Sequence, residues 1–99
     1  MLTNSSIRKS VEEYIKLRLR EIPLELENSF FKIKQIWKCE NEIDFLYGYY
    51  VGKLEEGAIH YLLKAKRSST DDFDSFEIRG IIETYRKQLY YIITKFLSK

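Results

Sequence analysis

The sequence from Asn41 to Arg67, NEIDFLYGYYVGKLEEGAIHYLLKAKR, decides the fold, because it is the longest run with one consistent periodicity. At 100° per residue its apolar side chains gather on one side of a helix and most of its charged side chains on the other. Asn41 can cap the start, and the basic residues near the end suit the negative pole of the helix dipole. We therefore predict a helix over residues 42–66. Its apolar face comprises Ile43, Tyr47, Tyr50, Val51, Leu54, Ala58, Tyr61, Leu62 and Ala65.

Three glycines inside this helix, Gly48, Gly52 and Gly57, together cost about 3 kcal/mol relative to alanine. Gly48 and Gly52 stand one turn apart, where they would let the backbone of another helix approach closely. The alternative is a kink or a short break of the helix near Gly57. Because charged residues interrupt the segment, the spacing of the glycines does not indicate a membrane-embedded dimer.

Residues 29–67 also allow a second interpretation. Apolar and polar residues alternate in Phe31–Lys34 and Ile59–Tyr61, and such alternation is typical of β-strands. In this alternative the fold is α+β, with a three-stranded antiparallel meander between two helices.

Helices over residues 5–21, 23–38 and 75–97 are predicted on either side of residues 42–66. Pro23 is expected to separate the first two, because proline disfavours helical geometry in its predecessor and can begin the next helix. Asp74 is expected to cap the helix over 75–97, after a polar loop. The expected buried side chains are Ile7, Val11, Tyr14, Ile15, Leu19, Leu26, Phe30, Ile33, Trp37, Ile78, Ile81, Ile82, Tyr85, Leu89, Ile92, Ile93 and Phe96.

The sign of the charge alternates in blocks along the chain. Acidic blocks fall at the proposed helix starts and basic blocks at the proposed ends, as the helix dipole favours. Glu21–Glu27, for example, is an acidic block at the proposed start of helix 23–38. Strands offer no reason for this coincidence, so the charges favour a compact all-α domain of four helices spanning residues 1–99.

Composition restricts the class of protein. Ninety-nine residues suit one domain with its own core, and a net charge of +2 gives no general attraction to nucleic acid or anionic membranes. One cysteine allows no internal disulfide, and neither a signal peptide nor a long apolar span is evident, so we expect a cytoplasmic protein. Its 12 isoleucines, 11 lysines and 11 glutamates resemble thermophile usage.

No motif for catalysis, metal binding or cofactor binding is evident in the sequence. His60 lies one turn after Glu56 on the polar side of its helix, where we expect a surface ion pair rather than half of a metal site. Cys39 is expected to be a packing residue rather than a reactive thiol. No glycine-rich phosphate-binding loop is present. We therefore expect a non-enzymatic protein that binds another macromolecule, without a cofactor or small-molecule substrate.

Aromatic residues point to protein binding as the function. Eight tyrosines and six phenylalanines exceed what a core of this size requires, and tyrosine is enriched at protein interfaces. We predict an interaction module or accessory subunit that binds a partner protein, or a second copy of itself, through the aromatic faces of helices 42–66 and 75–97. The interface candidates are Phe45, Gly48, Tyr49, Gly52, Tyr90 and Tyr91.

Binding of nucleic acid is the alternative function. Basic side chains on the first and last helices, and at the end of helix 42–66, would contact phosphates if folding brought them together. Otherwise they compensate helix dipoles and keep the surface hydrated. The candidates are Arg8, Lys9, Lys16, Arg20, Lys66, Arg67, Arg79, Arg86 and Lys87.

Overall fold

Helices make up nearly all of the chain that the computed structural model describes, which is residues 5–36, 38–67, 69 and 75–98. No strand occurs among these residues. The predicted all-α four-helix fold is confirmed, and the alternative of a meander over residues 29–67 is wrong. The helices are α1 (Ser5–Ile36), α2 (Glu42–Lys64), α3 (Ser75–Thr84) and α4 (Arg86–Leu97).

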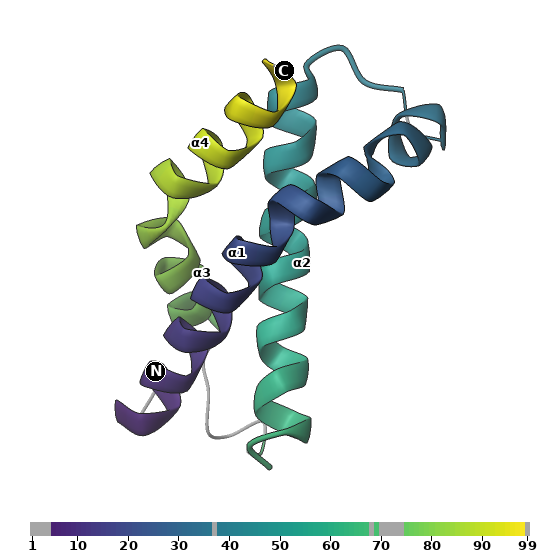
Figure 1. The fold of residues 1–99 in the computed structure, drawn as a ribbon. Coiled ribbons are helices and arrows are strands. Elements are labelled where there is room, and N and C mark those ends of the chain that lie inside the picture. Colours follow the sequence, from purple (N-terminus) through teal and green to yellow (C-terminus); the bar gives the residue numbers. More distant parts are fainter. Residues whose placement is uncertain (1–4, 37, 68, 70–74, 99) are drawn as a thin grey trace.

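The helices form three roughly lengthwise arms (Figure 1). α1 runs the length of the molecule, α2 returns beside it, and α3 and α4 follow one another along the third arm. α2 packs against each of the other three helices. The result is an elongated body of 41 × 24 × 21 Å with its core along the inner side of α2.

The core is built from apolar side chains at helical spacing. On α2 the buried positions recur every four residues, and they include Leu46, which the predicted apolar face omits. Several predicted core tyrosines, among them Tyr47 and Tyr61, are only half-buried at the edges of this face, and Ala65 is exposed. The core cluster consists of Val11, Ile15, Leu19, Ile22, Leu26, Phe30, Leu46, Tyr50, Leu54, Ala58, Leu62, Ile78, Ile81, Ile82, Leu89 and Ile93.

α1 continues through Pro23, so the prediction of separate helices over 5–21 and 23–38 is wrong. Proline removes one backbone hydrogen bond and crowds the preceding turn, at a cost of about 3 kcal/mol. Leu19, Ile22 and Leu26 are buried on one face on both sides of the proline, and burying each stabilises the fold by about 1.5–3 kcal/mol. Burial therefore outweighs the proline, and α1 bends in its middle instead of ending (Figure 1).

The arm predicted as one helix over residues 75–97 is divided at Tyr85. Tyr85 N–H donates to the Ile82 carbonyl at 2.9 Å, three residues back, which tightens the chain locally. The Thr84 hydroxyl donates to the Ile81 carbonyl at 2.6 Å, and such side-chain bonds to the preceding turn compete with the helical pattern. The arm therefore consists of α3 and α4, and Ile82 and Leu89 are buried on either side of the break.

The predicted cap of α2 is confirmed. The Asn41 side-chain oxygen accepts a hydrogen bond from the Asp44 N–H at 3.0 Å, and the helix begins at Glu42. α2 ends at Lys64, two residues before the predicted end at residue 66. The expected cap at Asp74, the polar loop before it and the expected burial of Trp37 lie outside the described residues.

The glycines of α2 act differently from expectation. α2 runs unbroken through Gly57, so the short break suggested there does not occur. A Cβ atom at Gly57 would meet the hydroxyl of Tyr14, whose ring stacks on Tyr61 with centroids 5.1 Å apart. A Cβ atom at Gly48 or Gly52 would meet nothing within 4 Å. Among the described residues no helix of this chain uses the space beside these two glycines.

Candidate functional site

An apolar groove lies between the second half of α1 and α4, and we call it the α1–α4 groove. One hollow of about 330 Å³ is lined by Pro23, Tyr91, Ile92, Lys95 and Phe96. A second hollow of about 300 Å³ shares Phe96 with the first, and the groove comprises both hollows. The second hollow is lined by Phe30, Phe31, Lys34, Glu42, Phe96 and Leu97.

The α1–α4 groove has a packed floor and exposed aromatic sides. Phe30 of α1 packs edge-to-face against Phe96 of α4, with ring centroids 5.4 Å apart. Phe31 is 76% exposed and Tyr91 is 62% exposed. Large exposed aromatic side chains around an apolar hollow are typical of surfaces that bind another macromolecule.

Phe31 was not among the predicted interface residues, although the sequence contains a signal for it. Leu17, Leu24 and Phe31 are seven residues apart, which places them on one outer stripe of α1, and all three are exposed. The predicted end of a helix at Pro23 divided this stripe between two elements. Only a continuous α1 puts the three side chains in line.

Four predicted interface residues lie together on the outer side of α2. Asp44, Phe45, Gly48 and Tyr49 line an open hollow of about 540 Å³. The rings of Phe45 and Tyr49 stack with centroids 6.1 Å apart. Gly52 lies one turn further along the same side and is exposed. We call these residues the α2 surface.

Tyr90 and Tyr91, adjacent in sequence, have different surroundings. Tyr90 stacks on Tyr47 of α2 with centroids 4.4 Å apart, and the guanidinium of Arg86 lies over both rings at 5.5 and 5.9 Å. Tyr90 therefore holds α4 against α2. Tyr91, about 100° further around α4, faces the α1–α4 groove and is the predicted residue of this pair that a partner can reach.

Several of the basic residues proposed for phosphate binding are engaged with carboxylates. Arg79 makes two bonds to Glu55, at 2.6 and 3.3 Å, and the hydrogen bonding to Glu55 raises the pKa of its guanidinium. The Arg8 guanidinium lies 3.4 Å from Glu12 and 3.9 Å from Glu77, and Arg86 lies 3.1 Å from Glu83. The other candidates are exposed: Lys9, Lys16, Arg20, Lys66, Arg67 and Lys87.

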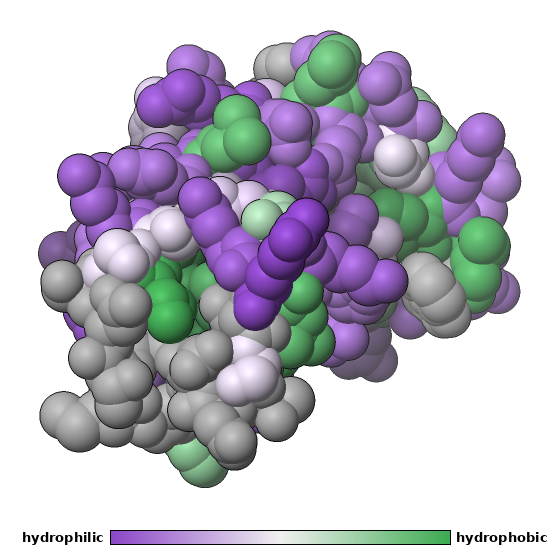
Figure 2. Space-filling view, turned by 90° about the horizontal axis from the view of Figure 1, so that it is seen from below, coloured by the Kyte–Doolittle hydropathy of each residue, from purple (hydrophilic) through white to green (hydrophobic). Residues whose placement is uncertain are grey.

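These exposed basic residues are spread over different parts of the fold. The start of α1 and the end of α2 lie at the same end of the molecule, whereas Lys87 lies on α4 (Figure 1). Seen from that end, the surface is largely hydrophilic with separate hydrophobic patches (Figure 2). The described basic candidates thus lie on several helices, and Lys87 lies on a different helix from those at this end of the molecule.

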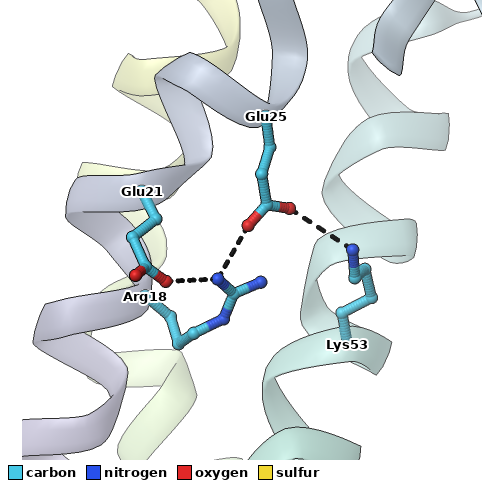
Figure 3. A network of polar contacts seen from close by, with 4 residues as sticks. All are labelled: Arg18, Glu21, Glu25 and Lys53. Carbon is cyan, nitrogen blue, oxygen red and sulfur yellow. Dashed lines mark hydrogen bonds and ion pairs between the residues drawn. The ribbon is translucent and has the colours of Figure 1, made fainter. Parts of the chain in front are cut away.

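A network of charged side chains joins the bend of α1 to α2 (Figure 3). Arg18 bonds to Glu21, before Pro23, and to Glu25 at 2.7 Å, after it. Lys53 of α2 reaches Glu25 at 3.3 Å. Burial acts against both charges, but the hydrogen bonds between them raise the pKa of Arg18 and lower that of Glu25. The network holds both halves of α1 and α2 in fixed relation below the groove.

Cys39 and His60 lie outside any recognisable catalytic or metal site in the described part of the chain. Cys39 is a half-buried free thiol and His60 is exposed. Within the described ranges, no group of three or more His, Cys, Asp or Glu side chains is placed to hold a metal ion. No helix in the described part of the chain is both long and apolar enough to span a bilayer.

Comparison with protein-family models, curated proteins and solved structures finds no match to this chain. The surfaces of the molecule therefore carry the evidence for its function.

Proposed function

We propose that this protein is a non-enzymatic protein-interaction module and that the α1–α4 groove is its binding surface. The observation that supports the proposal is the exposure of Tyr91 and Phe31, which line two neighbouring apolar hollows that share Phe96. Interfaces concentrate their binding energy in such aromatic side chains next to pockets. Phe30 and Phe96, which both line the second hollow, already pack against one another and join α1 to α4 there.

The test is affinity capture from a lysate of the native host, with and without nuclease. The bait is the full chain, either unchanged or carrying Phe31→Ala and Tyr91→Ala together. We expect a defined set of proteins that survives nuclease and is lost from the double variant. Because both side chains are largely exposed, their removal should leave the thermal melting temperature nearly unchanged.

Phe76→Ala is the matched control. Phe76 is 74% exposed, like Phe31, but lies on α3 away from the groove. The control bait should retain every partner that the unchanged bait captures. Equal loss of partners from Phe76→Ala and from the groove variant would contradict the assignment of the groove. Partners that vanish with nuclease alone would favour the nucleic acid alternative.

Self-association through the α2 surface is a second candidate. The observation that favours it is the open hollow beside the stacked rings of Phe45 and Tyr49, next to two glycines without a neighbouring side chain. A second copy of α2 would approach closely there. Light scattering during size-exclusion chromatography should then show a dimer that Gly52→Leu converts to a monomer, and a monomeric unchanged protein would rule this candidate out.

A further inference from the structure

We propose that the partner of the α1–α4 groove is an amphipathic helix rich in aspartate and glutamate. Its apolar side chains would contact Tyr91 and Phe96, and its carboxylates would lie opposite Lys87 and Lys95. This inference rests on the proposed function and adds the chemistry of the partner to it.

The charges along α4 carry the proposal. The helix has no acidic residue between Arg86 and Leu97. Lys87 and Lys95 stand one turn before and after Tyr91, and the Lys95 ammonium lies 5.6 Å from the centre of the Tyr91 ring. Both lysines are exposed. A partner that covers Tyr91 must therefore lie against two cations, and carboxylates on its flanks would complement them.

The opposite side of the groove adds little negative charge. On α1, Arg20 lies one turn before Pro23 and is exposed, while Glu27 lies one turn after it and is not free. Lys34 and Glu42 neutralise one another at 2.8 Å. The groove thus has more cationic side chains than carboxylates that could pair with them. This excess of positive charge favours an acidic partner over a basic or neutral one.

The length of α4 suits a partner helix that reaches both Lys87 and Lys95. α4 has 12 residues and is about 18 Å long at 1.5 Å per residue. A partner helix of about three to four turns would follow this length and present apolar side chains at every third or fourth position. The phosphates of a nucleic acid duplex offer nothing apolar that could cover Tyr91 and Phe31, so a protein helix uses more of the surface than a duplex does.

The test is selection from a displayed library of helical peptides on the full-length protein. The peptides, of about 14 residues to match the groove, carry leucine at every third or fourth position. Asp, Glu, Lys, Arg, Ser and Gln are equally frequent elsewhere. We expect the selected peptides to be strongly enriched in Asp and Glu. A selected peptide should bind the Lys87→Glu, Lys95→Glu double variant roughly tenfold more weakly.

The control is a double variant with the same change in net charge away from the groove, Lys9→Glu with Lys64→Glu. Both lysines are exposed, one near the start of α1 and one at the end of α2. Peptide affinity should stay within about twofold, because distant surface charges are screened by salt. Peptides without acidic enrichment, or an equal loss of binding in the control, would overturn the proposal.

Duplex oligonucleotides and vesicles containing anionic lipid are assayed in parallel. Another outcome is that one of these ligands binds while the library yields no acidic peptide. If the Lys87→Glu, Lys95→Glu double variant then abolishes binding of that ligand, the two lysines serve it and the proposal fails. Host proteins that are captured through Phe31 and Tyr91 but are insensitive to reversal of the lysines would leave the protein-binding function standing. That result would contradict only the proposal that the partner is acidic.

Discussion

At the scale of single residues, the glycines of α2 show how one residue type serves different purposes along one helix. Gly57 makes room for the Tyr14 hydroxyl, which lets the Tyr14 ring stack on Tyr61 across the contact of α1 with α2. Gly48 and Gly52 face open space. Helix propensity penalises all three alike, so only the neighbours distinguish them.

Alanine substitutions should change the stability of the protein differently at Gly57 than at Gly48 and Gly52. Gly48→Ala and Gly52→Ala are each expected to raise the free energy of unfolding by about 0.5–1 kcal/mol, because alanine favours the helix and its methyl group meets nothing. Gly57→Ala should leave it at or below the wild-type value, since Tyr14 must give up its stacked position. Urea denaturation measures all three. A gain at Gly57 equal to that at Gly48 would show that Tyr14 moves without loss.

Truncation of core side chains should be far more damaging. Tyr50 and Ile82 are almost completely buried, as predicted. We expect Tyr50→Ala or Ile82→Ala to lower the free energy of unfolding by about 2–5 kcal/mol, the range for large-to-small core changes. Denaturant melts provide the measurement. A variant within about 0.5 kcal/mol of wild type, the usual range for surface substitutions, would remove that residue from the core.

At the scale of elements, α1 depends on contacts beyond its own sequence. Pro23 and the acidic residues around it have the features of a helix boundary. Glu25 nevertheless binds Arg18 across the proline and also binds Lys53, and Glu21 binds the same Arg18 from before the proline. The acidic block therefore stabilises a bent helix instead of beginning a new one. The bend carries Pro23 into the wall of the α1–α4 groove.

Stability should depend on pH through Glu25. Burial raises the pKa of Glu25, but the hydrogen bonds and charges of Arg18 and Lys53 lower it by more than burial raises it. The pKa of Glu25 in the folded protein therefore lies below its value in the unfolded chain. The network therefore stabilises the fold above the unfolded pKa of about 4.3, and this stabilisation disappears as pH falls through the lower folded value. Glu25→Gln should cost about 1 kcal/mol at pH 7 and almost nothing below the folded pKa.

The control for this prediction is Glu13→Gln, an exposed glutamate on the first half of α1. Its effect should be small at both pH values, because exposed carboxylates contribute little. Thermal melts at several pH values compare both variants with wild type. A Glu25→Gln penalty that persists at low pH would mean that the variant disturbs packing rather than the charge network.

At the scale of the whole molecule, α2 is the helix on which the others depend. It packs against α1, α3 and α4 and supplies core residues along its whole length. Because none of the other helices can bury its apolar face without α2, partial unfolding of the described part of the chain would expose most of the core. That residues 1–99 form one domain stays a prediction.

We therefore expect the protein to unfold in one cooperative transition. Far-ultraviolet circular dichroism reports helix, and the near-ultraviolet signal of the tyrosines reports packing of side chains. Thermal melts followed by the two signals should coincide, as for other small single domains. Loss of the near-ultraviolet signal well before the helix signal would contradict a single transition, because it would mean that side-chain packing is lost while the helices remain.

The candidate site shows where sequence reasoning stops. Aromatic abundance drew attention to Tyr90 and Tyr91 alike, but it could not separate Tyr91 from Tyr90. A rotation of about 100° on α4 places one ring against Tyr47 and the other beside the groove. The neighbours of each ring come from helices distant in sequence, so no local pattern contains this information.

The sequence by itself determined the helical class, the inward faces of the helices and the cap at Asn41, because periodicity and capping act over a few neighbouring residues. The tertiary structure alone decided that α1 passes through Pro23, that the last arm breaks at Tyr85, and that a groove opens between α1 and α4. Each of these outcomes balances a local preference against burial between distant segments. Burial prevails because it involves many side chains at once, whereas the local penalties arise at single residues.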